Sequence, residues 1–203
     1  MRKTIVTILV AAMFLVTAAA EVSAQEVFMN SAETINQGNI KLALFPTVLF
    51  GKNGSDSVWG LAGRLGYGLT PRLDIEVKGA IFKDLNYFGL DVEYWLIKGR
   101  NINVSAAVGG HMTDSKGGAD SSGFDLGLLA STSPVRNLEI YGGLKLAFDS
   151  VKNSDQNHTL AHLVPGIEYR LSDDLDFLAE IGIGLNDSSR SYASVGLALY
   201  LLR

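Results

Sequence analysis

The sequence has no cysteine among its 203 residues, and its only long apolar run lies at the N-terminus. An exported chain without disulfides has to be held together by a hydrophobic core of its own or by a membrane. Lys and Arg number 17 against 21 Asp and Glu, the net charge is -4, and the basic residues are scattered. The absence of a basic cluster argues against nucleic acid as a partner.

The first 24 residues have the layout of a secretory signal peptide. Met1-Arg2-Lys3 is basic, Thr4 to Val16 is apolar, and the small residue Ala24 precedes Gln25. The apolar run is short for a membrane-spanning helix, which leaves an uncleaved anchor as the alternative. We therefore predict a signal peptide at 1–24, a polar lead-in without sustained periodicity at 25–38, and one domain at 39–203.

Apolar and polar residues alternate through most of this domain. The clearest segment is 73–82, where one parity is apolar and the other charged: Leu73, Ile75, Val77 and Ile81 against Asp74, Glu76 and Lys78. Successive side chains of a strand point to opposite faces. The segment is therefore predicted to be a strand with one apolar and one charged face.

The same pattern recurs ten times, at 39–50, 58–67, 73–82, 88–97, 102–112, 124–131, 138–148, 158–169, 175–184 and 192–202. Short turns such as 132–137 alternate with generally more polar, Gly-rich loops, of which 113–122 is the longest. We predict ten strands paired as hairpins, with eight as the alternative count. Pro46 and Pro165 fall inside strands, and because proline cannot donate to a ladder we expect bulges there.

Aromatic residues of the apolar parity gather near the strand ends, with Phe50, Trp59, Phe88, Phe124 and Phe148 near the loops and Tyr67, Tyr94, Tyr169 and Phe177 near the turns. A lipid-facing band with interfacial aromatics has this layout. The opposite parity is rich in small residues such as Gly60, Gly127 and Gly182, as a narrow lumen requires. In hydrocarbon only a closed sheet leaves no backbone group unpaired. The prediction is an all-β, antiparallel up-and-down transmembrane β-barrel; a soluble lipocalin-like barrel is the alternative.

From Asn39 to Arg203 the chain resembles the small bacterial outer-membrane β-barrel proteins. The resemblance rests on the signal peptide, the hairpin repeat, turns such as Gly68 to Asp74, and the terminal segment Gly196 to Leu201. It implies a location in the bacterial outer membrane, with short turns facing the periplasm and loops facing outside. It also implies contact with membrane lipid and lipopolysaccharide and folding by the barrel-assembly machinery. The family usually ends in an aromatic residue, whereas this chain ends in Leu202-Arg203.

Charged residues of the inward parity are the candidate functional residues. We predict a lumen lined by Arg64, Glu76, Lys78, Asp91, Glu93, Asp125, Lys145, His162, Glu168 and Glu180, with Asp74, Glu139 and Asp176 at the periplasmic mouth. Buried charges need partners, so the set could form a salt-bridged plug. Its acidic excess could equally line a narrow, water-filled pore that favours cations.

Histidines offer few sites for other chemistry. His158 and His162 are separated by about 13 Å along a strand, too far to share a metal. His111 with Asp114 would suit a hydrolase, as in the resembling outer-membrane proteases and lipid A deacylases, only if the two groups converge. Gly182-Ile183-Gly184 lies within a strand, so it is no nucleotide loop. We expect no cofactor, no metal and no enzymatic activity.

These features favour a small porin-like passive channel for ions or small solutes, with an acidic, narrow lumen. A non-conducting structural or adhesive barrel is the first alternative, and an outer-membrane hydrolase the second.

Overall fold

The computed structural model describes residues 32–52, 55–116, 120–152 and 157–201. The predicted signal peptide and the first half of the predicted lead-in lie outside the described residues. Ten strands make up most of the described chain: β1 (Ile40–Leu49), β2 (Val58–Thr70), β3 (Leu73–Phe82), β4 (Leu85–Lys98), β5 (Asn103–Ser115), β6 (Ser121–Val135), β7 (Leu138–Val151), β8 (Asn157–Arg170), β9 (Leu175–Gly184) and β10 (Tyr192–Leu201).

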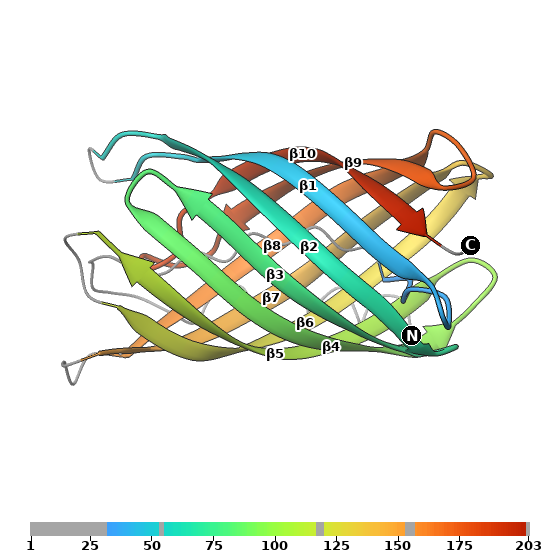
Figure 1. Ribbon diagram of the computed structural model, residues 1–203, viewed down its shortest axis with the longest axis horizontal. Helices are drawn as coiled ribbons and strands as arrows, with labels where there is room; N and C mark the ends of the chain where they lie inside the picture. The colour runs from blue at the N-terminus through green and yellow to red at the C-terminus, as the bar shows by residue number, and fades with distance from the viewer. Residues whose placement is uncertain (1–31, 53–54, 117–119, 153–156, 202–203) are drawn as a thin grey trace, which may run out of the picture.

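The strands form one closed antiparallel barrel in which each strand pairs with its neighbours in sequence and β1 pairs with β10 (Figure 1). This confirms the predicted all-β, up-and-down barrel and its ten strands; the count of eight is wrong. Several strands are longer than predicted. β5 and β6 extend into the predicted loop at 113–122, and β6 continues to Val135 through most of the predicted turn at 132–137.

The two ends of the barrel differ. The β2–β3, β4–β5, β6–β7 and β8–β9 connections lie at one end, here called the turn end, where β1 begins and β10 finishes (Figure 1). The other five connections form the loop end. Every strand crosses the full length between these two ends, so each side chain can be placed by its distance from either one.

Both prolines that interrupt the alternation are accommodated without a bulge. Pro46 stays paired with Leu61 of β2, and Pro165 with Gly142 of β7. On the other side, the β1–β10 and β8–β9 ladders skip the proline and the residue before it, then resume in the same register. The expected bulges are therefore wrong, because the missing N–H interrupts one ladder without requiring an extra residue. Register shifts occur instead near the turn end.

The outer wall is apolar. Leucine, isoleucine and valine side chains of the outward parity are exposed along every strand, and exposed rings of Trp59 and Phe88 lie toward the loop end. Tyr67, Tyr94 and Tyr169 are exposed toward the turn end. Exposed apolar bands flanked by rings face lipid in membrane barrels. Within the described residues, no helix is long and apolar enough to cross a membrane.

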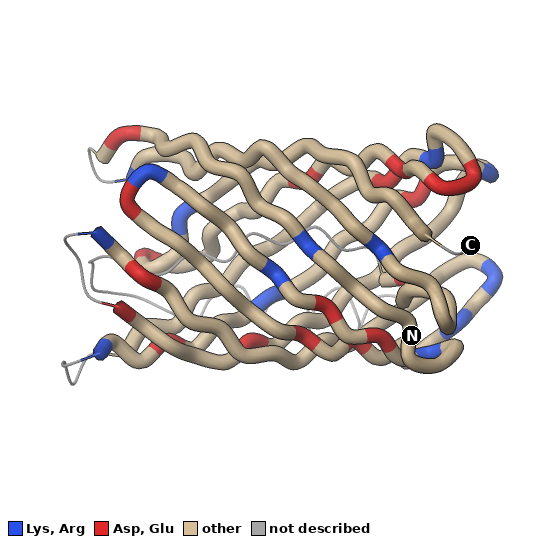
Figure 2. The backbone as a smooth tube through the Cα atoms, viewed as in Figure 1, with Lys and Arg blue, Asp and Glu red and all other residues tan. Residues whose placement is uncertain are grey.

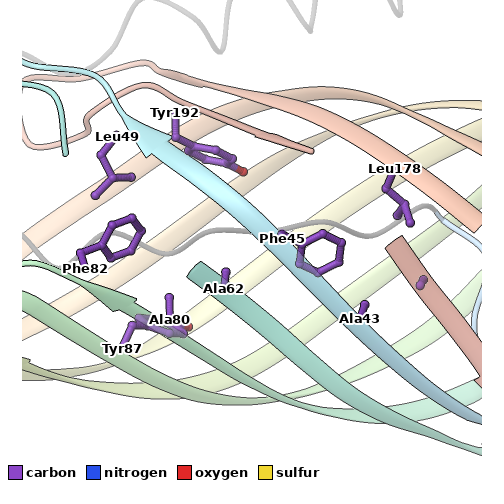
Figure 3. Close-up of a cluster of buried hydrophobic side chains, with 10 residues drawn as sticks. Ala43, Phe45, Leu49, Ala62, Ala80, Phe82, Tyr87, Leu178 and Tyr192 are labelled. Atoms are coloured by element: carbon purple, nitrogen blue, oxygen red, sulfur yellow. The ribbon is translucent and has the colours of Figure 1, made fainter. Parts of the chain in front are cut away.

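An apolar cluster fills part of the lumen, mainly beneath β1 to β4 and β10. Figure 3 shows the rings of Phe45, Phe82, Tyr87 and Tyr192 pointing inward together with small side chains such as Ala62. Four inward rings each lie over a glycine of the adjacent strand: Phe45 over Gly196, Phe82 over Gly60, Tyr141 over Gly166, and Tyr192 over Gly182. In each case an added Cβ would collide with the ring. The small residues of the inward parity thus make room for the large ones.

The described part of the lead-in, residues 32–38, folds back into the turn end of the barrel. Ala32, Thr34 and Ile35 are buried. The backbone N–H of Ile35 donates to the Asp74 carboxylate at 2.7 Å, and the Ile35 side chain lies over Gly66 of β2. A segment read from the sequence as a loose lead-in is therefore part of the lumen.

Gly38 provides the turn that joins the lead-in to β1. Its φ of 83° is in the left-handed region, which glycine adopts without a Cβ clash. Its N–H donates to the carbonyl of Gly68 at 2.8 Å, and the N–H of Gly68 donates to the carbonyl of Asn39 at 3.1 Å. These bonds hold the lead-in against the end of β2.

Candidate functional site

The predicted lumen and mouth residues lie on the inward face of the barrel. Twelve of the thirteen are at most 9 % exposed, and Glu139 is half-buried. Charged residues occur along the strand bodies as well as at both ends (Figure 2). The outer wall between the ends is nevertheless apolar. The structure divides them into a layer at mid-barrel, a cluster toward the loop end and a cavity at the turn end.

The layer at mid-barrel, here called the central layer, consists of Lys41, Arg64, Glu76, Lys78 and Asp91. The Nε of Arg64 lies 2.5 Å from Glu76, and the Nζ of Lys78 lies 2.6 Å from Asp91. The second contacts are longer, at 3.8 Å between Arg64 and Asp91 and 3.7 Å between Lys41 and Glu76. All five side chains are buried. They form one connected set of buried ion pairs on the adjacent strands β1 to β4.

Strand register determines how these pairs form. Arg64 lies directly opposite Lys78 across β2–β3, and Glu76 lies directly opposite Asp91 across β3–β4. Like charges placed directly opposite each other are destabilising. The ion pairs therefore run diagonally between adjacent rows, and each row depends on the other for its counter-charges.

Toward the loop end, His111 lies between two carboxylates. Its Nδ1 is 3.0 Å from Asp125, its Nε2 is 2.6 Å from Asp149, and its ring stacks on Tyr87 at 5.5 Å between centroids. An ionised carboxylate only accepts hydrogen bonds, so both contacts are satisfied when both ring nitrogens carry hydrogen. Lys78, 4.0 Å from Asp125, connects this His111 cluster to the central layer.

The His111–Asp114 pair on which the hydrolase alternative depended does not form. Asp114, the predicted partner, is exposed, whereas His111 is buried and engaged by carboxylates from β6 and β7. Among the described residues, no group of three or more His, Asp and Glu side chains could hold a metal ion.

Glu180 and His162 are held by neutral groups. The hydroxyls of Tyr141 and Tyr192 donate to Glu180 at 3.1 and 2.5 Å. His162 lies opposite Lys145 across β7–β8, and its Nε2 lies 3.0 Å from the backbone carbonyl of Arg190. Glu180 is thus held within the lumen by two rings, and His162 is linked to the β9–β10 connection at the loop end.

At the turn end, the lead-in and the barrel wall enclose a cavity of about 280 Å³. We call it the turn-end cavity. Its lining includes Glu33, Glu139, Glu168 and Asp176, two arginines, and the rings of Trp95 and Tyr200. The hydroxyl of Tyr200 donates to Glu168 at 3.1 Å, and the amide of Asn103 donates to Glu33 at 2.9 Å.

Glu33 is the only one of these carboxyl groups outside the strands. Burial and the nearby charge of Glu168 raise the pKa of Glu33 above its ordinary value of 4.5, and the cations of Arg170 and Lys98 oppose this shift.

Sequence reasoning missed several members of the site. Lys41 has the inward parity of the first strand, so alternation alone could have identified it. Asp149 was assigned to a loop, although β7 continues to Val151. Glu33 carries no periodic signal, because the lead-in is neither a strand nor a helix over this stretch.

The outer membrane protein beta-barrel domain family model matches residues 7–197. The chain belongs to this family. With the closed barrel and its apolar outer wall, the match shows a protein of the bacterial outer membrane. No curated protein matches the sequence closely enough to be called a relative.

The chain is similar to several solved structures at low sequence identity. The COG4313 outer membrane channel from Pseudomonas putida F1 is 10 % identical, with a TM-score of 0.60 over 87 % of this chain and 100 % of that chain. The outer membrane protease OmpT from Escherichia coli is 11 % identical, with a TM-score of 0.46 over 84 % and 100 %. The outer membrane protein OprG from Pseudomonas aeruginosa is 14 % identical, with a TM-score of 0.40 over 85 % and 99 %.

Proposed function

We propose that this family member is a narrow, cation-preferring passive channel, with the central layer as its closed point. The observation that carries the proposal is the charge of the lumen. Among the described residues, nine Asp and Glu side chains are buried in the barrel, compared with four Lys and Arg side chains and two His side chains. Even with both histidines charged, the acids outnumber the bases, and mobile cations in the lumen would offset the difference.

A barrel that only had to stay shut would not need this composition. Removing charges from water is costly, and a buried ion pair replaced by well-packed apolar residues is often as stable or more stable. The apolar cluster beneath β1 to β4 shows that this chain can fill its lumen with rings. Charges at mid-barrel are therefore better explained by passage of ions than by closure alone.

Single-channel recording tests the proposal. The protein, residues 25–203, is refolded in detergent and inserted into a planar bilayer separating two KCl concentrations. We expect discrete openings whose reversal potential favours K⁺, and Glu76→Gln with Glu180→Gln should reduce that preference. Asp114→Asn is the matched control, because Asp114 is exposed rather than in the lumen.

A second recording tests the central layer as the closed point. Replacing Arg64 and Glu76 together by serine removes both members of one pair; Asp91 keeps its contact with Lys78, and Lys41 loses its contact with Glu76. We expect openings several-fold more frequent or larger than in the parent protein. A protein that inserts, as shown by protease protection in liposomes, but stays silent in both forms would overturn the channel.

The second candidate function is a non-conducting structural barrel. The dense pairing in the central layer supports it, because Arg64 and Lys78 each reach a carboxylate and both are buried. Under this alternative the Ser–Ser variant stays silent, and any contact with lipopolysaccharide or other partners belongs to the outer surface and loops.

A further inference from the structure

In the turn-end cavity, as between Glu76 and Asp91 in the central layer, carboxylates face one another across a strand pair. Glu139 and Glu168 lie directly opposite each other across β7–β8, and both line the cavity. Directly opposed like charges are destabilising unless something lies between them. Glu33 adds a third carboxylate from the lead-in, beside Glu168. The arrangement suits a positive charge placed among the three.

The cations that line the cavity do not fully provide that charge. Arg170 lies 3.8 Å from Asp176, the fourth carboxylate of the lining, and is itself exposed. The other arginine, Arg136, is exposed in the β6–β7 turn. Four carboxyl groups therefore line the cavity with two exposed arginines, and the exposed Lys98 acts on Glu33 from outside the lining.

The aromatic lining points to an organic rather than an inorganic cation. The cavity is lined by Trp95 and Tyr200, and tryptophan is the ring that attracts cations most strongly. The ammonium of Lys98 already lies 4.2 Å from the Trp95 centroid, so this ring is in use as a cation acceptor. Trp95 and Tyr200 thus add an apolar, cation-attracting surface to the carboxylates.

The indole of Trp95 provides an independent indication of a ligand. Trp95 is only 6 % exposed, and within the described part of the chain its N–H has no hydrogen-bond partner. A buried indole N–H usually has an acceptor. A ligand oxygen in the cavity would supply one.

We propose that the turn-end cavity binds a small organic cation that carries an ammonium group and a hydrogen-bond-accepting oxygen. The ammonium lies among Glu33, Glu139 and Glu168, and the oxygen accepts from Trp95. Binding itself follows from the cavity alone. Its role as the periplasmic docking point for solutes of the channel rests on the proposed function.

Choline is the probe, because it combines a quaternary ammonium with a hydroxyl. Two matched analogues separate its features: tetramethylammonium lacks the oxygen, and 3,3-dimethylbutan-1-ol replaces the charged nitrogen with carbon. The chain has two tryptophans, and Trp59 is 71 % exposed at the outer wall. In a Trp59→Phe protein, the fluorescence of Trp95 reports on the cavity alone.

In refolded protein we expect saturable choline-dependent changes in Trp95 fluorescence, weaker binding of tetramethylammonium, and none of the neutral alcohol. Glu139→Gln with Glu168→Gln should weaken choline at least tenfold by calorimetry, whereas Glu180→Gln, deeper in the lumen, should leave it within twofold. Trp95→Phe should weaken choline several-fold while leaving tetramethylammonium unchanged.

Equal binding of choline and the neutral alcohol, or full choline affinity in the Glu139/Glu168 variant, would overturn the site. Heat-dependent mobility on gels shows whether each variant is folded, and if the double variant fails to fold, the single Glu139→Gln and the three-ligand comparison decide. The two proposals fail separately: choline binding in an electrically silent barrel retains the site and rejects the channel, and K⁺ current without choline binding does the reverse.

Discussion

The central layer and the turn-end cavity are built from the same kinds of side chain, yet they differ in how their charges are balanced. In the central layer, each row of like charge is paired diagonally with a row of opposite charge, as Arg64 with Glu76 and Lys78 with Asp91. In the cavity, Glu139 faces Glu168, and the charged part of the lining consists of four carboxyl groups and two arginines. The ion pairs of the central layer thus balance charges within the layer, whereas the proposed charge balance of the cavity requires a bound cation.

Breaking the central layer should have the largest effect on stability. Arg64→Met leaves Glu76 and Asp91 with a lost partner in a buried position, and removing one member of a buried pair typically costs about 3–5 kcal/mol. Urea unfolding in lipid vesicles, followed by tryptophan fluorescence, measures the change. Arg72→Met, exposed in the β2–β3 turn, is the control and should change stability little. Equal urea midpoints for the two variants would show that the buried ion pairs of the central layer do not stabilise the barrel.

Overpacking the apolar part of the lumen should have the next largest effect. A Cβ at Gly182 would collide with the ring of Tyr192, which also donates to Glu180. Gly182→Ala should therefore destabilise the barrel by about 1–3 kcal/mol, the usual cost of forcing a packed core apart. Gly110→Ala is matched, because its Cβ would have its nearest neighbour at an ordinary 3.6 Å. If both alanines cost the same, steric fit in the lumen is not the cause.

The pH dependence of choline binding tests the turn-end cavity, with a smaller expected effect. Burial and the charge of Glu168 raise the pKa of Glu33 above 4.5, so at pH 4.5 most of the Glu33 population in the folded protein is neutral. As pH rises through the raised pKa, Glu33 ionises and the affinity for a cation should rise a few-fold. Glu33→Gln should flatten this part of the profile in calorimetric titrations. A profile that keeps its full slope in the glutamine variant would place the titration on another group.

The barrel could be read from the sequence because lipid and lumen impose opposite chemistry on alternate residues. Leu73, Ile75 and Val77 face outward and Asp74 and Glu76 inward, so parity alone separates the two faces. The ten strands and the inward charged set follow from this rule. Strand ends were less predictable, since polar residues continue β5 and β6 beyond the membrane-facing part.

Partners across the barrel could not be read from one sequence. His111 was matched with Asp114 because they are neighbours in the chain, but strand pairing brings Asp125 and Asp149 to its two nitrogens instead. The lead-in was missed for a different reason. It is held by a backbone bond from Ile35 to Asp74 and by a turn at Gly38, and neither produces a periodic pattern.

The smallest effect is expected where a charge pair is exposed. The Nζ of Lys152 lies 3.9 Å from Asp120 at the loop end, with side chains 70 % and 46 % exposed. Both charges stay hydrated when separated, so Lys152→Met should change the free energy of unfolding by less than about 1 kcal/mol. The same urea titration that measures Arg64→Met measures this variant, and salt should matter little in either. If Lys152→Met cost as much stability as Arg64→Met, burial would not explain the contribution of the central layer. The contrast between the central layer and the turn-end cavity would then rest only on the number of charges in each.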